Sequence, residues 1–391
     1  MLNFTYSNHT DIIFGKGTQH TVGQHIKPHA GKILLHYGGG SIKRSGLYEE
    51  IIRSLQEAGI EIHELGGVQP NPTLDLVREG ITLCRRHAIP FILAVGGGSV
   101  IDSAKAIALG APSSGDVWEY YISKQPADFT PLRVATVLTI PAAGSESSPN
   151  SVITCTATKR KLGYGDPQLR PVFSIVNPEL FYTLPENQLA YGACDMMSHI
   201  FERYFTNTPH TDLTDALCEA TLRTIINNAR LLRHGGLRQY DPWAELAFSG
   251  TIAHNNLLGL GREQDWACHA MEHELSARYD VPHGAGLAVV TPAWMRYIYK
   301  NHIPIFLQFA ERVMGVTIPP RQPETAILEA IRRLEAYYEE MGLPTTMRQL
   351  GIPADHFAEM AAQAVSVRGP IGGLQKLDAN DVLAIYNLAD R

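Results

Sequence analysis

Hydrophobic and polar positions follow different periods in the two halves of the 391-residue chain. In the first half, short apolar runs alternate with segments in which apolar residues recur at helical spacing. The apolar runs predict buried strands over residues 32–37, 60–65, 91–95 and 134–140. The segments between them predict helices over residues 47–58, 71–87 and 100–109. A short hairpin over residues 3–8 and 11–15 is predicted to precede them. Short strands that alternate with helices are typical of a parallel sheet wrapped by helices.

The pattern changes after Leu184-Pro185, where helical periods begin to predominate. Pro185 suits the first residue of a helix, because its fixed φ is compatible with a helical start. The predicted helices cover roughly residues 186–206, 211–233, 242–258, 265–277, 284–300, 303–314, 322–341, 353–365 and 379–389. The sequence therefore predicts an α/β domain over residues 1–184 and an all-helical domain over residues 185–391.

Composition narrows the class of function. An apolar share of 45% and a charged share of 18% describe a globular protein, and a formal charge of −6 argues against a nucleic-acid-binding surface. No apolar run approaches the length of a membrane span, and the first residues lack the pattern of a secretory signal. The five cysteines are scattered and odd in number, which favours reduced thiols in a cytoplasmic protein.

Three predicted strands run into glycine-containing loops, at residues 38–41, 96–99 and 141–146. A glycine cluster between a strand and a helix lets phosphate oxygens approach main-chain N–H groups at the helix N-terminus. The carboxyl ends of parallel strands share one edge of the sheet, where ligands of open α/β folds bind. We therefore expect a nucleotide at this edge, although the spacing is not the ordinary G-x-G-x-x-G fingerprint.

Two later fragments carry residues with metal-ligand chemistry. Asp195 and His199 are four apart on a predicted helix, as are His269 and His273, so each pair projects from one helix face. His283 follows at a Pro-His-Gly break between helices. One carboxylate and three imidazoles suit Fe²⁺ or Zn²⁺ and leave room for a substrate oxygen. The spacing alone does not choose between His269 and His273 as a ligand.

An alternative hypothesis rests on the same histidines. His269-x-x-Glu272-His273 fits the inverted zinc-protease pattern, in which both histidines bind metal and the glutamate is the base of a hydrolase. That function would leave the glycine loops, Asp195 and His199 without a role.

Together these motifs resemble the iron-dependent (group III) alcohol dehydrogenases, in particular their butanol dehydrogenase and aldehyde reductase branch. The resemblance covers essentially the whole chain and rests on residues 96–105, 139–146, 195–202, 269–273 and 282–284. It implies a Rossmann-like dinucleotide-binding domain, a helical metal-binding domain like that of dehydroquinate synthase, and a cleft that holds both ligands. The implied activity interconverts small primary alcohols and aldehydes with NAD(P). Glycerol-type polyol dehydrogenases are a sister family, and their pattern lacks an equivalent of His199 as a ligand.

The resemblance also assigns individual residues. It implies metal ligation by Asp195, His199, His269 and His283, with His273 close by but not a ligand. We expect His273 to be a catalytic residue that helps to move the proton. It places Gly97, Gly98 and Ser99 on the pyrophosphate, and it places the rest of the cofactor among Asp102, Thr139, Ser145 and Lys161. Ala143 departs from the family pattern, which often has threonine there.

The loop after the first predicted strand bears on the choice of cofactor. In dinucleotide folds an acidic residue at the ribose 2′-hydroxyl selects NAD, whereas its absence near basic groups accommodates a 2′-phosphate. Here Gly38, Gly39, Gly40 and Ser41 carry no carboxylate, and Lys43 and Arg44 lie just beyond. We therefore expect NADP to be preferred over NAD. We also expect a homodimer that binds neither nucleic acid nor a membrane.

Overall fold

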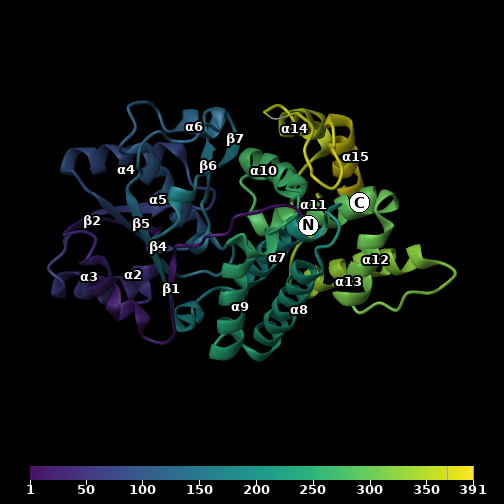
Figure 1. The fold of residues 1–391 in the computed structure, drawn as a ribbon, viewed down its shortest axis with the longest axis horizontal. Coiled ribbons are helices and arrows are strands. Elements are labelled where there is room, and N and C mark those ends of the chain that lie inside the picture. The colour runs from purple at the N-terminus through teal and green to yellow at the C-terminus, as the bar shows by residue number, and fades with distance from the viewer. Residues whose placement is uncertain (368, 391) are drawn as a thin grey trace. The chain divides into compact units, whose positions relative to one another are not determined.

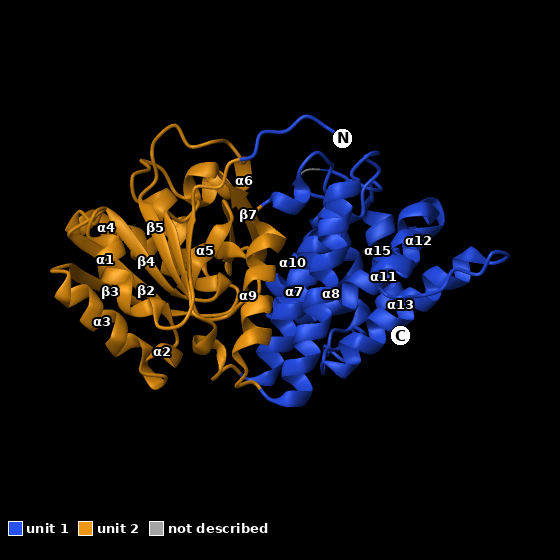
Figure 2. Ribbon diagram, turned by 60° about the horizontal axis from the view of Figure 1, so that its bottom comes forward, with its two compact units in different colours: residues 1–6, 185–236, 256–391 blue, residues 7–184, 237–255 orange. Residues whose placement is uncertain are grey.

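The computed structural model describes residues 1–367 and 369–390. It divides into two compact units, one of residues 1–6, 185–236 and 256–391 (unit 1) and one of residues 7–184 and 237–255 (unit 2) (Figure 2). Within the described residues, no helix is both long and apolar enough to cross a membrane.

Unit 2 contains a six-stranded sheet in which every neighbouring pair of strands is parallel. Its spatial order is β1 (Asp11–Phe14), β8 (Phe173–Val176), β5 (Arg133–Leu138), β4 (Phe91–Gly96), β2 (Lys32–Gly38) and β3 (Glu61–Val68). The chain runs from β2 to β3 on one side and then returns to β4 on the other side of β2. This reversal makes the space between β2 and β4 a topological switch point, the place where open α/β sheets bind ligands. The first two predicted glycine loops flank it.

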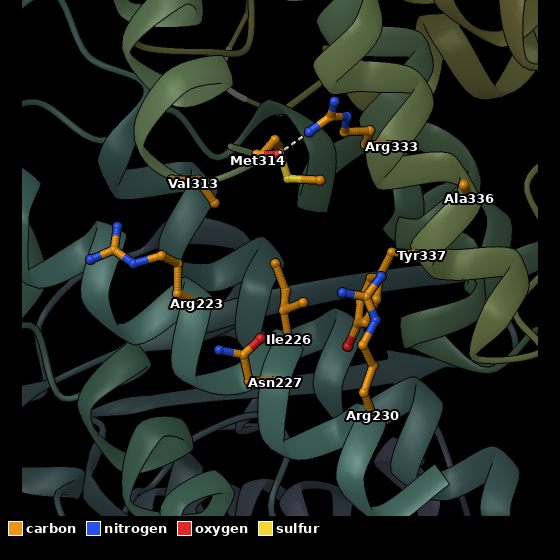
Figure 3. Close-up of a pocket in the computed structure, with 9 residues that line it drawn as sticks. All are labelled: Arg223, Ile226, Asn227, Arg230, Val313, Met314, Arg333, Ala336 and Tyr337. Atoms are coloured by element: carbon orange, nitrogen blue, oxygen red, sulfur yellow. Dashed lines mark hydrogen bonds between the residues drawn. The ribbon is translucent and has the colours of Figure 1, made fainter. Parts of the chain in front are cut away.

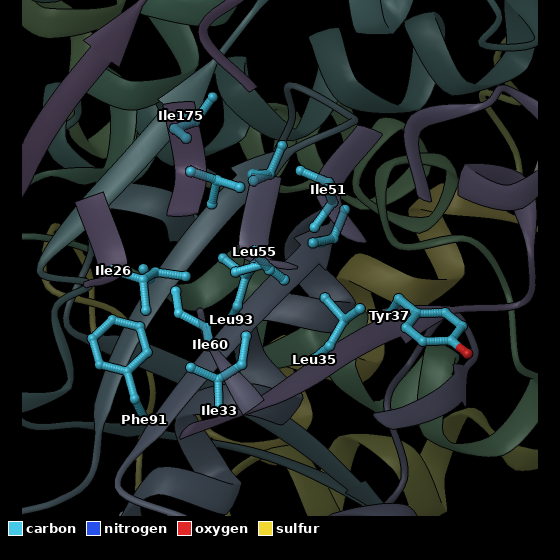
Figure 4. Close-up of a cluster of buried hydrophobic side chains, with 14 of the residues drawn as sticks. Ile26, Ile33, Leu35, Tyr37, Ile51, Leu55, Ile60, Phe91, Leu93 and Ile175 are labelled. Carbon is cyan, nitrogen blue, oxygen red and sulfur yellow. The ribbon is translucent and has the colours of Figure 1, made fainter. Parts of the chain in front are cut away.

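Helices cover both faces of this sheet, so its central strands are apolar along their whole length. On one face, Leu35 of β2 and Leu93 of β4 pack with Ile26 of α1 (Val22–Ile26) and with Ile51 and Leu55 of α3 (Leu47–Glu57) (Figure 4). On the other face lie α4 (Leu74–His87) and α5 (Gly98–Gly110). The alternation is visible at His36, which points away from the Leu35 cluster and contacts Ser103 of α5.

The predicted N-terminal hairpin is wrong. Asp11–Phe14 forms β1, but it pairs in parallel with β8, and residues 3–8 form no strand. Docking at β8 satisfies main-chain groups along a sheet edge, whereas an isolated hairpin is marginally stable at best. The strand prediction also missed β8 and the antiparallel pair β6 (Asn150–Cys155) and β7 (Arg160–Gly165). Three short α-helices, α1 (Val22–Ile26), α2 (Ser41–Arg44) and α6 (Trp118–Ser123), were likewise not predicted.

Unit 1 is helical, and the predicted helices correspond closely to those observed (Figure 1). Its α-helices are α7 (Glu186–Tyr204), α8 (Asp212–Gly235), α10 (Ala267–Tyr279), α11 (His283–Ile298), α12 (Ile303–Arg312), α13 (Pro323–Glu340), α14 (Phe357–Ala364) and α15 (Ala379–Ala389). Helix α11 packs against α7, α10, α13 and α15, and its residues 284–295 are all buried. A helix that is apolar on every side belongs in the centre of a bundle.

The chain passes from unit 2 to unit 1 at Pro185, but the segment 237–255 belongs to unit 2. Its helix α9 (Tyr240–His254) packs there through Trp243, whose ring meets Phe181 edge-on at 5.6 Å between centroids. The Thr251 hydroxyl donates to Glu146 Oε1 at 2.6 Å. The predicted division into two domains, residues 1–184 and 185–391, therefore stays a prediction.

Candidate metal centre

Helix α7 contributes the first two residues of the centre, which are one turn apart. His199 Nδ1 donates to the main-chain oxygen of Asp195 at 2.9 Å and lies 3.1 Å from Asp195 Oδ1. Both residues are buried, with 6% of Asp195 and 5% of His199 exposed. Because Nδ1 of His199 is engaged, Nε2 is the nitrogen that could bind a metal.

Helix α10 contributes His269, and a second residue of α7 orients it. Glu202 lies two turns after Asp195, and its Oε1 accepts a bond of 2.7 Å from His269 Nδ1. The same carboxylate accepts from the main-chain N–H groups of His269, at 3.0 Å, and Trp266, at 2.6 Å. His269 is thereby held with Nε2 3.9 Å from Asp195 Oδ1.

His283, the first residue of α11, is oriented in the same way by another buried glutamate. Its Nδ1 donates to Glu272, which also accepts from the Ser276 hydroxyl. His283 Nε2 then lies 3.8 Å from Asp195 Oδ1. Each of the three histidines therefore has Nδ1 engaged by an oxygen, and a carboxylate at that position fixes the tautomer in which Nε2 is the ligand atom.

The open atoms of this cluster fit a divalent cation. Ligand atoms of Asp195, His199 and His269 all lie within 4.8 Å of one another. Asp195 Oδ1 and His269 Nε2 are buried and have no hydrogen-bonding partner among residues 1–367 and 369–390. Buried polar atoms are rarely left unsatisfied, and a metal ion beside them would satisfy both.

The electrostatics of the cluster favour the ionisation states that a metal requires. Burial would raise the pKa of Asp195, but the imidazoles of His199, His283 and His269 outweigh it and hold that pKa well below its usual range. Burial lowers the pKa of His269, and the neighbouring His199 and His283 lower it further. Asp195 is therefore an anion and His269 a neutral donor at physiological pH, as metal ligation demands.

His273 lies beside the cluster rather than in its centre. Its ring centroid is 5.6 Å from that of His283 and 6.5 Å from that of His269. Atoms of His273, His283 and Glu272 lie within 4.8 Å of one another. The hydrolase hypothesis needs Glu272 as a base that reaches water, but Glu272 is fully buried and engaged by His283 and Ser276. The structure therefore does not support that alternative.

In unit 2 the glycine loops occupy the carboxyl edge of the sheet. Gly97 is the N-cap of α5, and Gly98 and Ser99 form the first turn of that helix. Thr139 follows β5, and its N–H donates to Gly96 O at 3.0 Å, which joins the second and third loops. A Cβ atom at Gly98 would lie 3.0 Å from Ala143 Cβ, so the two loops are in close contact.

Three further predicted cofactor residues are engaged by the protein. Ser145 Oγ donates to Asp102 Oδ1 at 2.6 Å, and the N–H of Val152 donates to Asp102 Oδ2 at 2.9 Å. Lys161 Nζ of β7 donates to Asn71 Oδ1 at 2.9 Å. Both oxygens of Asp102 are thus occupied, which makes it a bridge between α5 and the third loop.

The predicted cofactor-selecting loop lies at the end of β2. Gly38 is the last residue of the strand, and Gly39 and Gly40 lead into α2, which begins at Ser41. Gly40 has φ 99°, a left-handed conformation that favours glycine. A Cβ atom at Gly40 would lie 3.8 Å from the guanidinium of Arg44, which places a basic group beside the loop.

A hollow of about 360 Å³ in unit 1 lies between α8 and α13 (Figure 3). Its three arginines are bonded to the protein itself: Arg230 to Glu340, Arg333 to the carbonyl of Met314, and Arg223 to the carbonyl of Arg312. The hollow shares no residue with the histidine cluster and carries none of the predicted site residues.

Comparison with known proteins decides the family. The model of iron-containing alcohol dehydrogenases matches residues 9–178, and the model of the C-terminal region of the Fe-containing alcohol dehydrogenase family matches residues 189–389. The chain belongs to the iron-containing alcohol dehydrogenase family. It is therefore an oxidoreductase, and the family implies a divalent metal and an NAD(P) cofactor.

Relatives in this family span the whole chain. A probable NADH-dependent butanol dehydrogenase 1 of Bacillus subtilis is 43% identical over 98% of this chain and 99% of its own length. The NADPH-dependent aldehyde reductase YqhD of Escherichia coli is 34% identical over 90% of each chain. The crystal structure of an NADH-dependent butanol dehydrogenase A from Thermotoga maritima has a TM-score of 0.96, with 38% identity and coverage of 100% and 99%.

Sequence reasoning about this alcohol dehydrogenase missed the role of two glutamates. Glu202 was part of the recognised motif but was given no function, and Glu272 was considered only as a base. One signal was present, because Glu202 is seven residues after Asp195 and so lies on the same face of its helix. For Glu272 the pairing with His283 depends on how α10 and α11 pack, which the spacing does not contain.

Proposed function

We propose that the chain transfers hydride between a small primary alcohol or its aldehyde and NAD(P), with a divalent metal held by Asp195, His199, His269 and His283. The observation that carries this assignment is the convergence of Nε2 of His269 and of His283 on Asp195 Oδ1, at 3.9 and 3.8 Å. In each case a buried carboxylate engages Nδ1 of the histidine. This arrangement favours His269 over His273 as the ligand.

A divalent ion bound here would polarise the oxygen of the alcohol or the aldehyde. The remaining work falls to the chain. Asp195 and the three histidines would hold the ion. Glu202 keeps His269, and Glu272 keeps His283, in the metal-binding tautomer. The substrate meets the cluster on the side of His283, whose side chain is 25% exposed, compared with 7% for His269. His273 lies on that side, and its imidazole moves the proton of the substrate hydroxyl.

For the cofactor, we propose that Gly97, Gly98 and Ser99 present main-chain N–H groups to the pyrophosphate at the start of α5. Thr139 and Ser145 border the same edge. Asp102 contributes by holding Ser145, since both of its oxygens accept bonds from the protein. Lys161, anchored on Asn71, supplies a positive charge near Asp102.

We further propose that NADPH is preferred over NADH. The loop of residues 38–41 has no carboxylate that would repel a 2′-phosphate, and Arg44 reaches back to Gly40. The printed names of the relatives include both NADH-dependent and NADPH-dependent enzymes, so the preference must be measured for this chain. We also propose that the protein is cytoplasmic and forms a homodimer.

Three measurements on the purified protein test the function. Elemental analysis should find a divalent ion, and the fluorescence of NADPH should change on binding. Butanal should then be reduced with loss of NADPH absorbance. Protein that binds NADPH and metal but reduces no short aldehyde and oxidises no short alcohol would contradict the proposed reaction.

A further inference from the structure

A buried ammonium group lies beneath the glycine edge of unit 2. Lys105, on α5, has no exposed surface. Its Nζ donates to the main-chain oxygens of Ser145 at 2.7 Å, Ser148 at 2.9 Å and Asn150 at 2.9 Å. It also donates to the hydroxyl of Ser145 at 2.8 Å and lies 3.4 Å from that of Ser148.

These acceptors come from one short segment of chain that curves around the ammonium. The segment contains the 3₁₀ turn η2 (Ser145–Ser147) and leads into β6. Three carbonyls and two hydroxyls surround the charge, an oxygen-rich environment of the kind that proteins build around cations. A buried charge is costly unless its hydrogen bonds are satisfied, and buried carbonyl oxygens are costly unless they have a donor. The ammonium and the oxygens around it therefore depend on each other, which points to a role of Lys105 in shaping the segment.

The segment, residues 145–150, begins at the end of the third loop of the proposed dinucleotide site, residues 141–146. Ser145 Oγ, which accepts from Lys105, donates in turn to Asp102 one turn earlier on α5. Ala143 lies against Gly98, because a Cβ atom added at Gly98 would be 3.0 Å from Ala143 Cβ. Lys105 therefore connects the segment to the helix that begins at the second glycine loop, and it sets the spacing between the two loops.

We propose that Lys105 is a positioning residue of the dinucleotide site, whose ammonium acts as an internal cation that holds residues 145–150 against α5. The inference rests on the proposed function, because it requires the glycine edge to bind NAD(P). It assigns Lys105 no contact with the cofactor.

The first test measures NADPH affinity by fluorescence in Lys105→Ala and Lys105→Met. Loss of several charge-assisted hydrogen bonds should raise the Kd for NADPH by about ten- to a hundredfold. The metal content should not change, because the proposed metal ligands all belong to unit 1. Lys32→Met is the matched control: its ammonium bonds to His87 O at the opposite end of β2, so NADPH affinity should stay at the wild-type value.

Chemical rescue separates a cation requirement from general loss of packing. Propylammonium has the three carbons and the ammonium group that Lys105→Ala removes. Propylammonium chloride should restore NADPH affinity in Lys105→Ala, and sodium chloride at equal ionic strength should not. A folded Lys105→Ala variant with wild-type affinity would overturn the proposal, as would weakened affinity that propylammonium leaves unchanged.

A measurement on the wild-type protein covers the case in which both variants fail to fold. Burial lowers the pKa of Lys105 to about 8, an effect that Arg170 reinforces and that Asp102 and Glu146 partly oppose. Among the described residues, further titratable groups on or beside the segment include Lys161, His254, Tyr121 and Asp166. A neutral amine has one N–H fewer for the same acceptors, so NADPH affinity should fall as the pH rises through about 8. A constant affinity from about pH 7 to 9.5 would contradict the inference.

Failure of this inference can be told apart from failure of the proposed function. If the wild-type protein binds neither NADPH nor NADH, the proposed dinucleotide edge itself is wrong. If the wild-type protein binds NADPH and the Lys105 measurements show no effect, only the role of Lys105 is wrong.

Discussion

Side chains make the candidate metal centre of unit 1, whereas main-chain groups make most of the glycine edge of unit 2. The centre brings together Asp195, His199, His269 and His283 from three helices, and each position depends on one carboxylate or imidazole. At the edge, the groups proposed to face the cofactor are N–H donors at the start of a helix, and side chains such as Lys105 and Asp102 bond to the neighbouring loops. A single substitution in the metal centre should therefore abolish metal binding, whereas a single substitution at the glycine edge should only lower the affinity for the cofactor.

The largest expected effect comes from a reciprocal pair of substitutions, one in each region. Asp195→Asn removes the anionic member of the four proposed ligands and should leave the protein without metal. Because a metal contributes several kcal/mol of transition-state stabilisation, turnover should fall by about a thousandfold or more. NADPH affinity should be unchanged. Elemental analysis and NADPH fluorescence provide the two readouts.

Asp102→Asn is the counterpart in unit 2. It should retain the metal and weaken NADPH binding, because Asp102 holds Ser145 and β6. The contrast between the regions would be lost if either variant affected both ligands equally.

The next effect concerns the two histidines that the sequence could not tell apart. His269→Ala should lose the metal. His273→Ala should keep it and lose at least about a hundredfold in turnover, the usual contribution of a group that transfers a proton. Metal that stays with His269→Ala and is lost from His273→Ala would reverse the assignment.

These histidines show which features of the site can be predicted from the sequence and which cannot. Helices and glycine loops were predicted well, because their apolar spacing and their glycines are local signals. The partners of Nδ1 were not, since Glu202 and Glu272 meet His269 and His283 only after α7, α10 and α11 pack. Strand β8 was missed because it has only four residues, one of them the polar Ser174, and its pairing with β1 spans most of unit 2.

A smaller effect is expected when the glutamates lose their charge. Glu202→Gln and Glu272→Gln should weaken metal binding by about ten- to a hundredfold, because an uncharged partner orients the histidine less firmly. Competition with a chelator of known affinity measures this change. Glu219→Gln is a matched control, since Glu219 is also buried in unit 1 but bonds to Tyr204 and Gln308. Equal losses in all three variants would indicate general destabilisation instead.

The smallest effect lies at the edge of unit 2. The wild-type protein should prefer NADPH by about ten- to a hundredfold in kcat/KM, as one charge-assisted hydrogen bond provides. Gly38→Asp should erode or reverse this ratio by placing a carboxylate beside the 2′-phosphate. A Cβ atom at Gly38 would lie 3.4 Å from its nearest neighbour, the carbonyl oxygen of Val68, which is an ordinary contact distance. Gly38→Ala tests the added volume alone and should keep the NADPH preference. A wild-type ratio near one, or in favour of NADH, would show that this loop does not select NADPH.

Anomalous diffraction from crystals of the metal-loaded protein, recorded at the iron and zinc absorption edges, tests the central claim most directly. We expect one peak bounded by Asp195 Oδ1 and by Nε2 of His199, His269 and His283. A strong peak already at the iron edge identifies iron, whereas a peak that becomes strong only at the zinc edge identifies zinc. A peak coordinated by His273 in place of His269, or one away from Asp195, would contradict the proposed metal centre.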